Sequence, residues 1–181
     1  MEKLRQEQIE TCLWDDGLTL QKTRQLPYLT AVIEEVMRLH MVVPVVYRRA
    51  IRAINIDEFT IPTGSQVGIC YDATARMGPD QEGKPATDWL EFHPERYLEN
   101  NAAKGNERLT SAGRWSAPSF GGGARTCLGM ELAWLELRIF VSLFVKSGQW
   151  ALSGVDKVQW TDVATPQPIE DFSISLVKAN E

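Results

Sequence analysis

The sequence predicts an α+β protein that is mainly helical. Two segments repeat apolar residues at steps of three and four, the period of a helix, and a segment between them alternates β-branched apolar residues with polar ones, as strands do. The chain has 181 residues, of which 44% are hydrophobic and 24% are charged. This length and composition suffice for a packed core and argue against a disordered or low-complexity protein.

Composition and charge exclude several classes of function. The 24 acidic and 19 basic side chains give a net charge of −5, the wrong sign for a protein that binds nucleic acid. The three cysteines lie far apart without a Cys-x-x-Cys pair, so neither a disulfide framework nor a zinc site is expected. The N-terminus does not resemble a signal peptide, and no apolar stretch reaches the roughly 20 residues that span a membrane. We therefore expect an intracellular protein, in a reducing compartment, with no membrane anchor in this chain.

Residues 1–25 are expected to form a charged helical end and a linker, and residues 26–181 the main domain. Asp15-Asp16-Gly17 is a turn signal that ends the first helical segment. An amphipathic helix is predicted from Tyr28 to Leu39, with Pro27 suited to its first turn. Its apolar stripe consists of Leu29, Val32, Ile33, Val36 and Leu39.

The next part of the chain is expected to form strands and then a long loop. The β-branched residues after Pro44, with a turn at Pro62-Thr63-Gly64, predict a small meander of antiparallel strands. Residues 72–119 are rich in Pro, Gly, Asn and charged residues, which predicts irregular chain with a short helix around Asp88 to Leu98.

The C-terminal part is expected to contain a long helix and a hairpin. Leu128 to Gly148 has the helical period on two faces, which predicts a largely buried helix. The tail from Trp150 to Val177 alternates again and predicts a terminal hairpin.

The strongest candidate for chemistry is the loop Phe120-Gly-Gly-Gly-Ala-Arg-Thr-Cys127-Leu-Gly129, which places one cysteine at the start of the long helix. A cysteine thiolate is a soft ligand that binds iron well. The free amides and the positive dipole end at a helix N-terminus favour the thiolate form. Cys127 is therefore the candidate metal ligand, as the axial ligand of a haem iron.

The residues around Cys127 suit the same purpose. The glycines Gly121 to Gly123 free the backbone to turn its amides toward the sulfur, and Gly129 lets the helix approach a flat macrocycle closely. Arg125 can form a charge-assisted contact with a carboxylate such as a haem propionate, and Phe120 can cover the thiolate. The alternative, a glycine-rich turn followed by a core cysteine, does not explain the joint spacing with Phe120 and Arg125.

The loop matches the pattern Phe-x-x-Gly-x-Arg-x-Cys-x-Gly at all its fixed positions. It resembles the haem-binding signature of the cytochrome P-450 family of haem-thiolate monooxygenases. The resemblance implies the C-terminal portion of the cytochrome P-450 fold, with haem b (iron protoporphyrin IX) as cofactor. It also implies that Cys127 is the axial iron ligand and that Phe120, Gly123, Arg125 and Gly129 are cofactor-binding residues.

A second resemblance lies in Glu35-Val-Met-Arg38, whose charged residues share one face of the predicted helix. Alone, this spacing is common and is usually a surface ion pair. In the context LPYLTAVIEEVMRLH it resembles the helix before the first sheet of the same family, whose partner arginine would be Arg96 in Pro94-Glu95-Arg96. The resemblance implies that Glu35, Arg38 and Arg96 form a structural clamp on the irregular segment, not a catalytic group.

Arg48 matches a position at which the family often supplies a base for a haem propionate. Arg49 competes for this role, and a solvent-facing arginine is an equal alternative for either residue. His40 and His93 have no further ligand at metal spacing, so we expect both at the surface or in loops.

By resemblance, the chain is expected to be a truncated haem-thiolate monooxygenase that oxidises a small lipophilic substrate in secondary-metabolite biosynthesis, with electrons from a reductase. It would lie in the cytoplasm or at the periphery of the endoplasmic reticulum. No catalytic residue is assigned, because the family's distal helix, with its Ala/Gly-Gly-x-Asp/Glu-Thr pattern, is not found in the sequence. The alternative is a non-catalytic haem-binding or interaction fragment, or a degenerate gene product, so whether the chain is an enzyme stays open.

Overall fold

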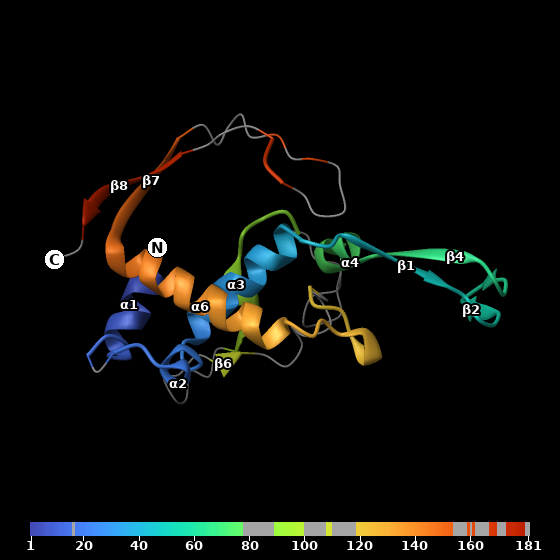
Figure 1. Ribbon diagram of the computed structural model, residues 1–181, viewed down its shortest axis with the longest axis horizontal. Helices are drawn as coiled ribbons and strands as arrows, with labels where there is room; N and C mark the ends of the chain where they lie inside the picture. The colour runs from blue at the N-terminus through green and yellow to red at the C-terminus, as the bar shows by residue number, and fades with distance from the viewer. Residues whose placement is uncertain are drawn as a thin grey trace.

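The computed structural model describes residues 1–15, 17–77, 89–99, 108–109, 119–153, 159, 161, 167–169 and 173–179 (Figure 1). The helices are α1 (Glu2–Glu10), α2 (Leu20–Thr23), α3 (Pro27–Leu39), α4 (Tyr71–Met77) and α6 (Met130–Ser147), with the 3₁₀ helices η1 (Pro94–Tyr97) and η2 (Gly123–Arg125). The strands are β1 (Val45–Arg49), β2 (Ile54–Ile56), β3 (Phe59–Ile61), β4 (Gln66–Cys70), β5 (Leu98–Glu99), β6 (Arg108–Leu109), β7 (Gly148–Ser153) and β8 (Ser173–Ala179). The predicted fold class, α+β and mainly helical, is confirmed.

Helix α3 lies at the centre of the helical part, where it contacts α1, α4, α6 and η1. Helix α6 packs against α3, and Figure 1 shows the two helices crossing. Pro27 at the first turn and the apolar stripe explain why this segment is a helix, and the predicted span is confirmed. The core around α3 contains the buried side chains of Leu4, Leu13, Leu26, Leu29, Ile33 and Val145.

Helix α1 confirms the helical start of the chain. Its Leu4, together with Leu13 in the turn that follows, belongs to the same core as α3. The boundary between residues 25 and 26 stays a prediction.

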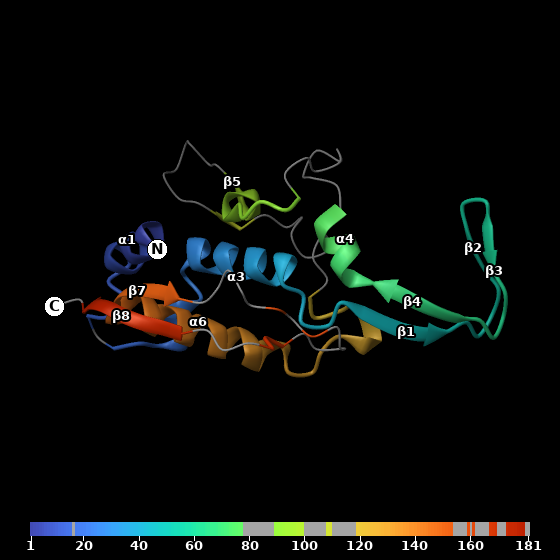
Figure 2. The same cartoon turned by 90° about the horizontal axis from the view of Figure 1, so that it is seen from above.

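The strands after Pro44 form an arm, residues 45–70, that projects from the helical part (Figures 1 and 2). The expected antiparallel pairing is confirmed, but the meander order is wrong: β1 pairs with β4, and the β2–β3 hairpin lies between them in the chain. The Pro62-Thr63-Gly64 turn precedes β4, with Gly64 at φ +88° and the Ser65 amide donating to the Pro62 carbonyl over 3.2 Å. Alternation predicts strands but does not encode which strand is the partner.

Part of the segment 72–119, which was expected to be irregular, is helical, because α4 extends from Tyr71 to Met77. Its seven residues are too few to show a clear period, and tertiary contacts stabilise it: Ala75 is buried against Met41, and Arg76 pairs with Asp72. The short helix expected near residues 88–98 is the 3₁₀ turn η1. Residues 78–88, 100–107 and 110–118 lie outside the described part of the chain.

The long C-terminal helix is confirmed as α6, but the prediction that it is largely buried is wrong. Only Ser142 and Val145 are buried along it, whereas Leu132, Phe140 and Leu143 are 59%, 65% and 49% exposed. The helical period shows where apolar faces lie but not whether something covers them.

The terminal hairpin is confirmed by the antiparallel pairing of β7 with β8, which lies at the opposite end of the molecule from the arm (Figure 1). None of the helices within the described ranges has both the length and the hydropathy needed to cross a membrane.

Candidate functional site

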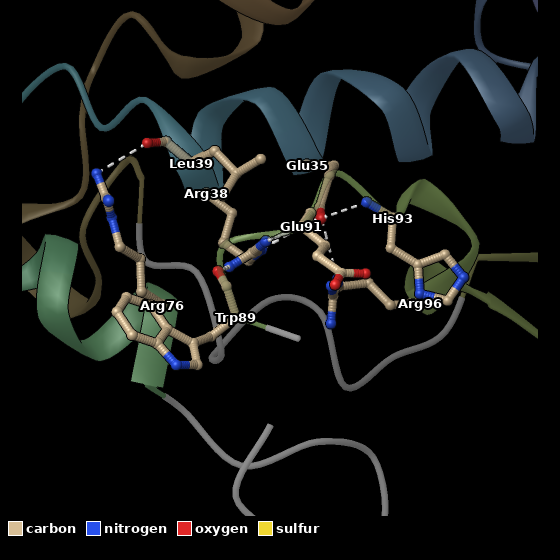
Figure 3. A network of polar contacts seen from close by, with 8 residues as sticks. All are labelled: Glu35, Arg38, Leu39, Arg76, Trp89, Glu91, His93 and Arg96. Atoms are coloured by element: carbon tan, nitrogen blue, oxygen red, sulfur yellow. Dashed lines mark hydrogen bonds and ion pairs between the residues drawn. The ribbon is translucent and has the colours of Figure 1, made fainter. Parts of the chain in front are cut away.

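A buried charge pair lies on α3. The side chain of Glu35 is 0% exposed, and Arg38 follows it by one helical turn. Arg38 Nε donates to Glu35 Oε2 over 2.7 Å and Arg38 Nη2 to Glu35 Oε1 over 2.9 Å (Figure 3). This two-point geometry is the strong form of an arginine–carboxylate contact.

The same pair binds the segment of residues 89–96, which leads into η1 and includes its first three residues. Arg96 Nε and the backbone N–H of His93 donate to Glu35 Oε1 over 3.1 and 2.8 Å. Arg38 in turn donates to the carbonyl oxygens of Trp89 and Glu91 over 2.7 and 3.1 Å. The predicted contacts of Glu35, Arg38 and Arg96 are therefore present, and they attach residues 89–96 to α3.

The electrostatic state of Glu35 follows from these partners. Burial raises the pKa of its carboxyl, but hydrogen bonds from Arg38 and the His93 amide, with the charges of Arg96 and Arg38, outweigh burial and hold the pKa below its usual range. Glu35 is thus ionised at neutral pH. Its acceptor oxygens face protein donors, which suits a structural role and not proton transfer.

The cysteine loop closes on itself just before α6. The Cys127 amide donates to the Phe120 carbonyl over 2.9 Å, and the Thr126 hydroxyl donates to the Gly123 carbonyl over 2.8 Å. Gly121 and Gly123 have φ values of +71° and +64°, a left-handed conformation that side chains disfavour. Gly121 and Gly123 thus have backbone conformations that favour glycine, whereas Gly122, at φ −157°, has extended backbone. That these glycines turn amides toward the sulfur stays a prediction.

The Cys127 thiol is exposed and is not in a disulfide. A Cβ built at Gly129 would lie 3.9 Å from Cys127 Sγ, so glycine leaves this side of the sulfur open. Phe120 is half-buried, with its ring centroid 6.3 Å from that of Trp134 in α6, and Arg125 is exposed. Within the described ranges, His, Cys, Asp and Glu side chains form no cluster of three or more that could hold a metal ion.

Arg48 lies on β1 opposite Val67, in the arm and not in the cysteine loop. Its side chain is exposed and donates to the carbonyl of Tyr47 over 2.8 Å. Arg49 is exposed as well. The assignment of either arginine to a haem propionate stays a prediction. His40 and His93 have exposed side chains, as expected.

Two residues that bind the ends of α3 were not predicted from the sequence. Glu7 in α1 accepts hydrogen bonds from the amides of Tyr28 and Leu29 over 2.6 and 2.8 Å. Arg76 in α4 donates to the Leu39 carbonyl over 2.9 Å (Figure 3). Neither contact has a local signal, because each residue is far from α3 in the sequence.

The family model for cytochrome P450 matches residues 1–168. The putative cytochrome P450 120 of Synechocystis sp. is 29% identical over 175 residues, which is 97% of this chain and 37% of that protein. The (S)-N-methylcoclaurine 3'-hydroxylase isozyme 1 of Eschscholzia californica is 32% identical over 152 residues, covering 83% of this chain and 28% of that protein.

A solved structure agrees with these relatives. The structure of retinoic acid-bound cyanobacterial CYP120A1 matches with a TM-score of 0.74 and 28% identity, covering 93% of this chain and 36% of that one. The chain thus spans about a third of the length of the relatives it matches. It belongs to the cytochrome P450 family, and this membership implies a haem b cofactor.

Proposed function

We propose that this chain supplies the thiolate side of a haem-dependent monooxygenase, with Cys127 as the axial ligand of the iron. One observation carries the proposal. The Cys127 thiol is exposed on a loop that is closed by the Cys127–Phe120 backbone hydrogen bond and shaped by two left-handed glycines. A ligand held by such a loop is oriented before the metal binds.

The residues around the thiol fit a flat iron macrocycle. Gly129 has no Cβ beside the sulfur, so a planar group can approach it. Among the residues that the structure describes, His, Cys, Asp and Glu side chains form no cluster of three or more, and a lone Cys127 thiolate suits an iron whose other ligands come from a porphyrin. When bound, a haem with a cysteine thiolate ligand supplies the oxygen chemistry of monooxygenation.

The chain's own residues would then bind and shield the group. Arg125 is exposed and lies two residues before Cys127 in the sequence, and we assign it to a haem propionate. Arg48 is a second candidate for this role. Phe120 is assigned to cover the thiolate, since its ring is held near Trp134. Gly123 and Gly129 allow the close approach.

The proposed substrate is a small lipophilic molecule, and the proposed source of electrons is a reductase. A relative named as an N-methylcoclaurine hydroxylase supports a place in secondary-metabolite biosynthesis.

The alternative is a non-catalytic haem-binding or interaction fragment. The exposed Leu132, Phe140 and Leu143 of α6 favour it, because such apolar patches are typical of surfaces that bind other protein.

Haem reconstitution tests the ligand assignment. The purified chain is loaded with haemin, reduced and exposed to carbon monoxide, and we expect the red-shifted Soret band of thiolate ligation. Cys127→Ala should abolish this band. Cys70→Ser is the matched control, because it removes another exposed thiol and should leave the band intact. A red-shifted band that survives Cys127→Ala would refute the assignment.

A further inference from the structure

Helix α4 is fixed to the C-terminal end of α3 by Arg76. Arg76 Nη2 donates to the Leu39 carbonyl over 2.9 Å (Figure 3). Arg76 Nε donates to Asp72 Oδ1 over 2.9 Å. Arg76 and Asp72 are 31% and 29% exposed, so both are partly shielded from water. A guanidinium at the last carbonyls of a helix also complements the negative end of its dipole.

The first residues of α4 are fixed as well. The Asp72 amide donates to the Pro44 carbonyl over 3.2 Å. The Tyr71 side chain packs against the small buried cluster of Met41 and Ala75. The start of α4 is therefore attached to Pro44 and its end to Leu39. These two attachments limit the movement of α4 relative to α3.

The Tyr71 hydroxyl lies beside the cysteine loop, next to the place that a side chain at Gly121 would occupy. A Cβ built at Gly121 would lie 3.6 Å from the Tyr71 hydroxyl oxygen, which is ordinary van der Waals distance. Gly121 directly follows Phe120, whose carbonyl accepts the hydrogen bond from the Cys127 amide. The hydroxyl thus approaches the loop one residue from the bond that closes it.

We propose that α4 positions the Cys127 loop: Arg76 fixes α4 to α3, and Tyr71 supports the backbone of Gly121. Tyr71 and Arg76 act through the loop and are positioning residues. Their effect on iron ligation rests on the proposed function of Cys127, but their effect on the loop itself does not.

Hydrogen exchange in the haem-free chain tests the contact directly. Arg76→Gln removes the charged donor, and Tyr71→Leu keeps the packing against Met41 but no longer reaches Gly121. Both should accelerate amide exchange in a peptide covering residues 119–130, by about fivefold for Arg76→Gln, the loss expected for a hydrogen bond of this kind. Arg52→Gln and Tyr47→Leu, exposed positions in the arm, are the matched controls and should leave that peptide unchanged.

Exchange in the β7–β8 hairpin serves as the internal reference, because the hairpin lies at the far end of the molecule from the arm. Unchanged exchange at residues 119–130 in both variants would overturn the proposal. Equal acceleration in the hairpin would also overturn it, since the variants would then loosen the whole protein.

The haem-loaded chain gives a second readout that a general loss of stability would not produce. Below the unfolding transition, Tyr71→Leu and Arg76→Gln should lower the fraction of the carbon monoxide complex with the red-shifted band, while the two controls keep it. A band unchanged in both variants would overturn the positioning role. If Cys127→Ala also kept the band, the ligand assignment would fail instead, and the exchange result would still decide whether α4 supports the loop.

Discussion

Glu35 shows how a buried carboxylate can stabilise a fold. Its oxygens are removed from water, which is costly, and donors from Arg38, Arg96 and the His93 amide offset this cost. Removing one partner costs more free energy than the pair itself contributes, because it leaves a buried charge without compensation. Arg38 supplies two of these hydrogen bonds and is 4% exposed, whereas Arg96 supplies one and is 20% exposed, so the two arginines should not be equivalent.

Arg38→Ala should therefore destabilise the protein strongly. Loss of one partner of a buried pair typically costs about 3–5 kcal/mol, and Arg96→Ala should cost less. Urea unfolding at neutral pH measures the free energy of unfolding, and Arg52→Ala in the arm is the control for loss of an exposed arginine. An unchanged unfolding midpoint for Arg38→Ala would mean that the pair behaves as ordinary surface charge.

The pKa of Glu35 gives a prediction about pH. Because this pKa is lower in the folded protein than its ordinary value of 4.5, the stabilisation from the charged carboxylate is complete above pH 4.5 and is lost as the pH falls through the folded-state pKa. The difference in free energy of unfolding between wild type and Glu35→Gln should be largest near neutral pH and should shrink below pH 4.5. Urea midpoints of both proteins across this range measure it, and other acidic groups cancel in the comparison. A difference that grows on acidification would contradict the prediction.

At the scale of elements, α3 is the best example of what sequence can and cannot predict. Its apolar stripe is local, so the span of the helix was predictable. Its end contacts come from Glu7 and Arg76, which the fold brings to α3 from other helices, so no local pattern marks them. Contacts between distant segments also stabilise α4, so its sequence alone did not predict a helix. They likewise decide which side of α6 is covered, so its exposed side was wrongly expected to be buried.

Glu7 should contribute to stability as a cap supplied by another helix. Its carboxylate binds the first amides of α3 and lies at the positive end of the helix dipole. Glu7→Gln should lower the free energy of unfolding by about 1 kcal/mol, as expected for loss of an N-terminal cap. Glu10→Gln is the matched control, because Glu10 is exposed on α1 and pairs with Gln6 in the same helix. Equal urea midpoints for the two variants would show that the cap contributes nothing.

At the scale of the whole molecule, the candidate site is assembled from distant segments. The Cys127 loop was recognisable because its residues are contiguous, and the Glu35 network because its residues match a family pattern. The approach of Tyr71 to Gly121 was not predictable, since it depends on how α4 packs. For Arg48 the sequence suggested a role that the fold does not test. Its position matches the family's propionate-binding base, but its exposed side chain lies in the arm, and its role stays a proposal.

The exposure of the cysteine region leads to the last prediction, that the 181-residue chain by itself binds haem but does not hydroxylate substrate at ordinary enzyme rates. Cys127 is exposed and the neighbouring Leu128 is fully exposed, so a group bound here would face water. Controlled oxygen chemistry needs a site from which water is excluded and a positioned proton donor.

The measurement is product formation from a panel of lipophilic substrates with a competent reductase, with hydrogen peroxide followed in parallel. We expect the electrons to appear in hydrogen peroxide and not in product, and Cys127→Ala serves as the control for haem bound without the thiolate. Coupled hydroxylation at about 1 per second or faster would contradict the prediction. It would mean that a second copy of the chain, or the haem itself, orders the exposed apolar residues around Cys127 into a closed pocket.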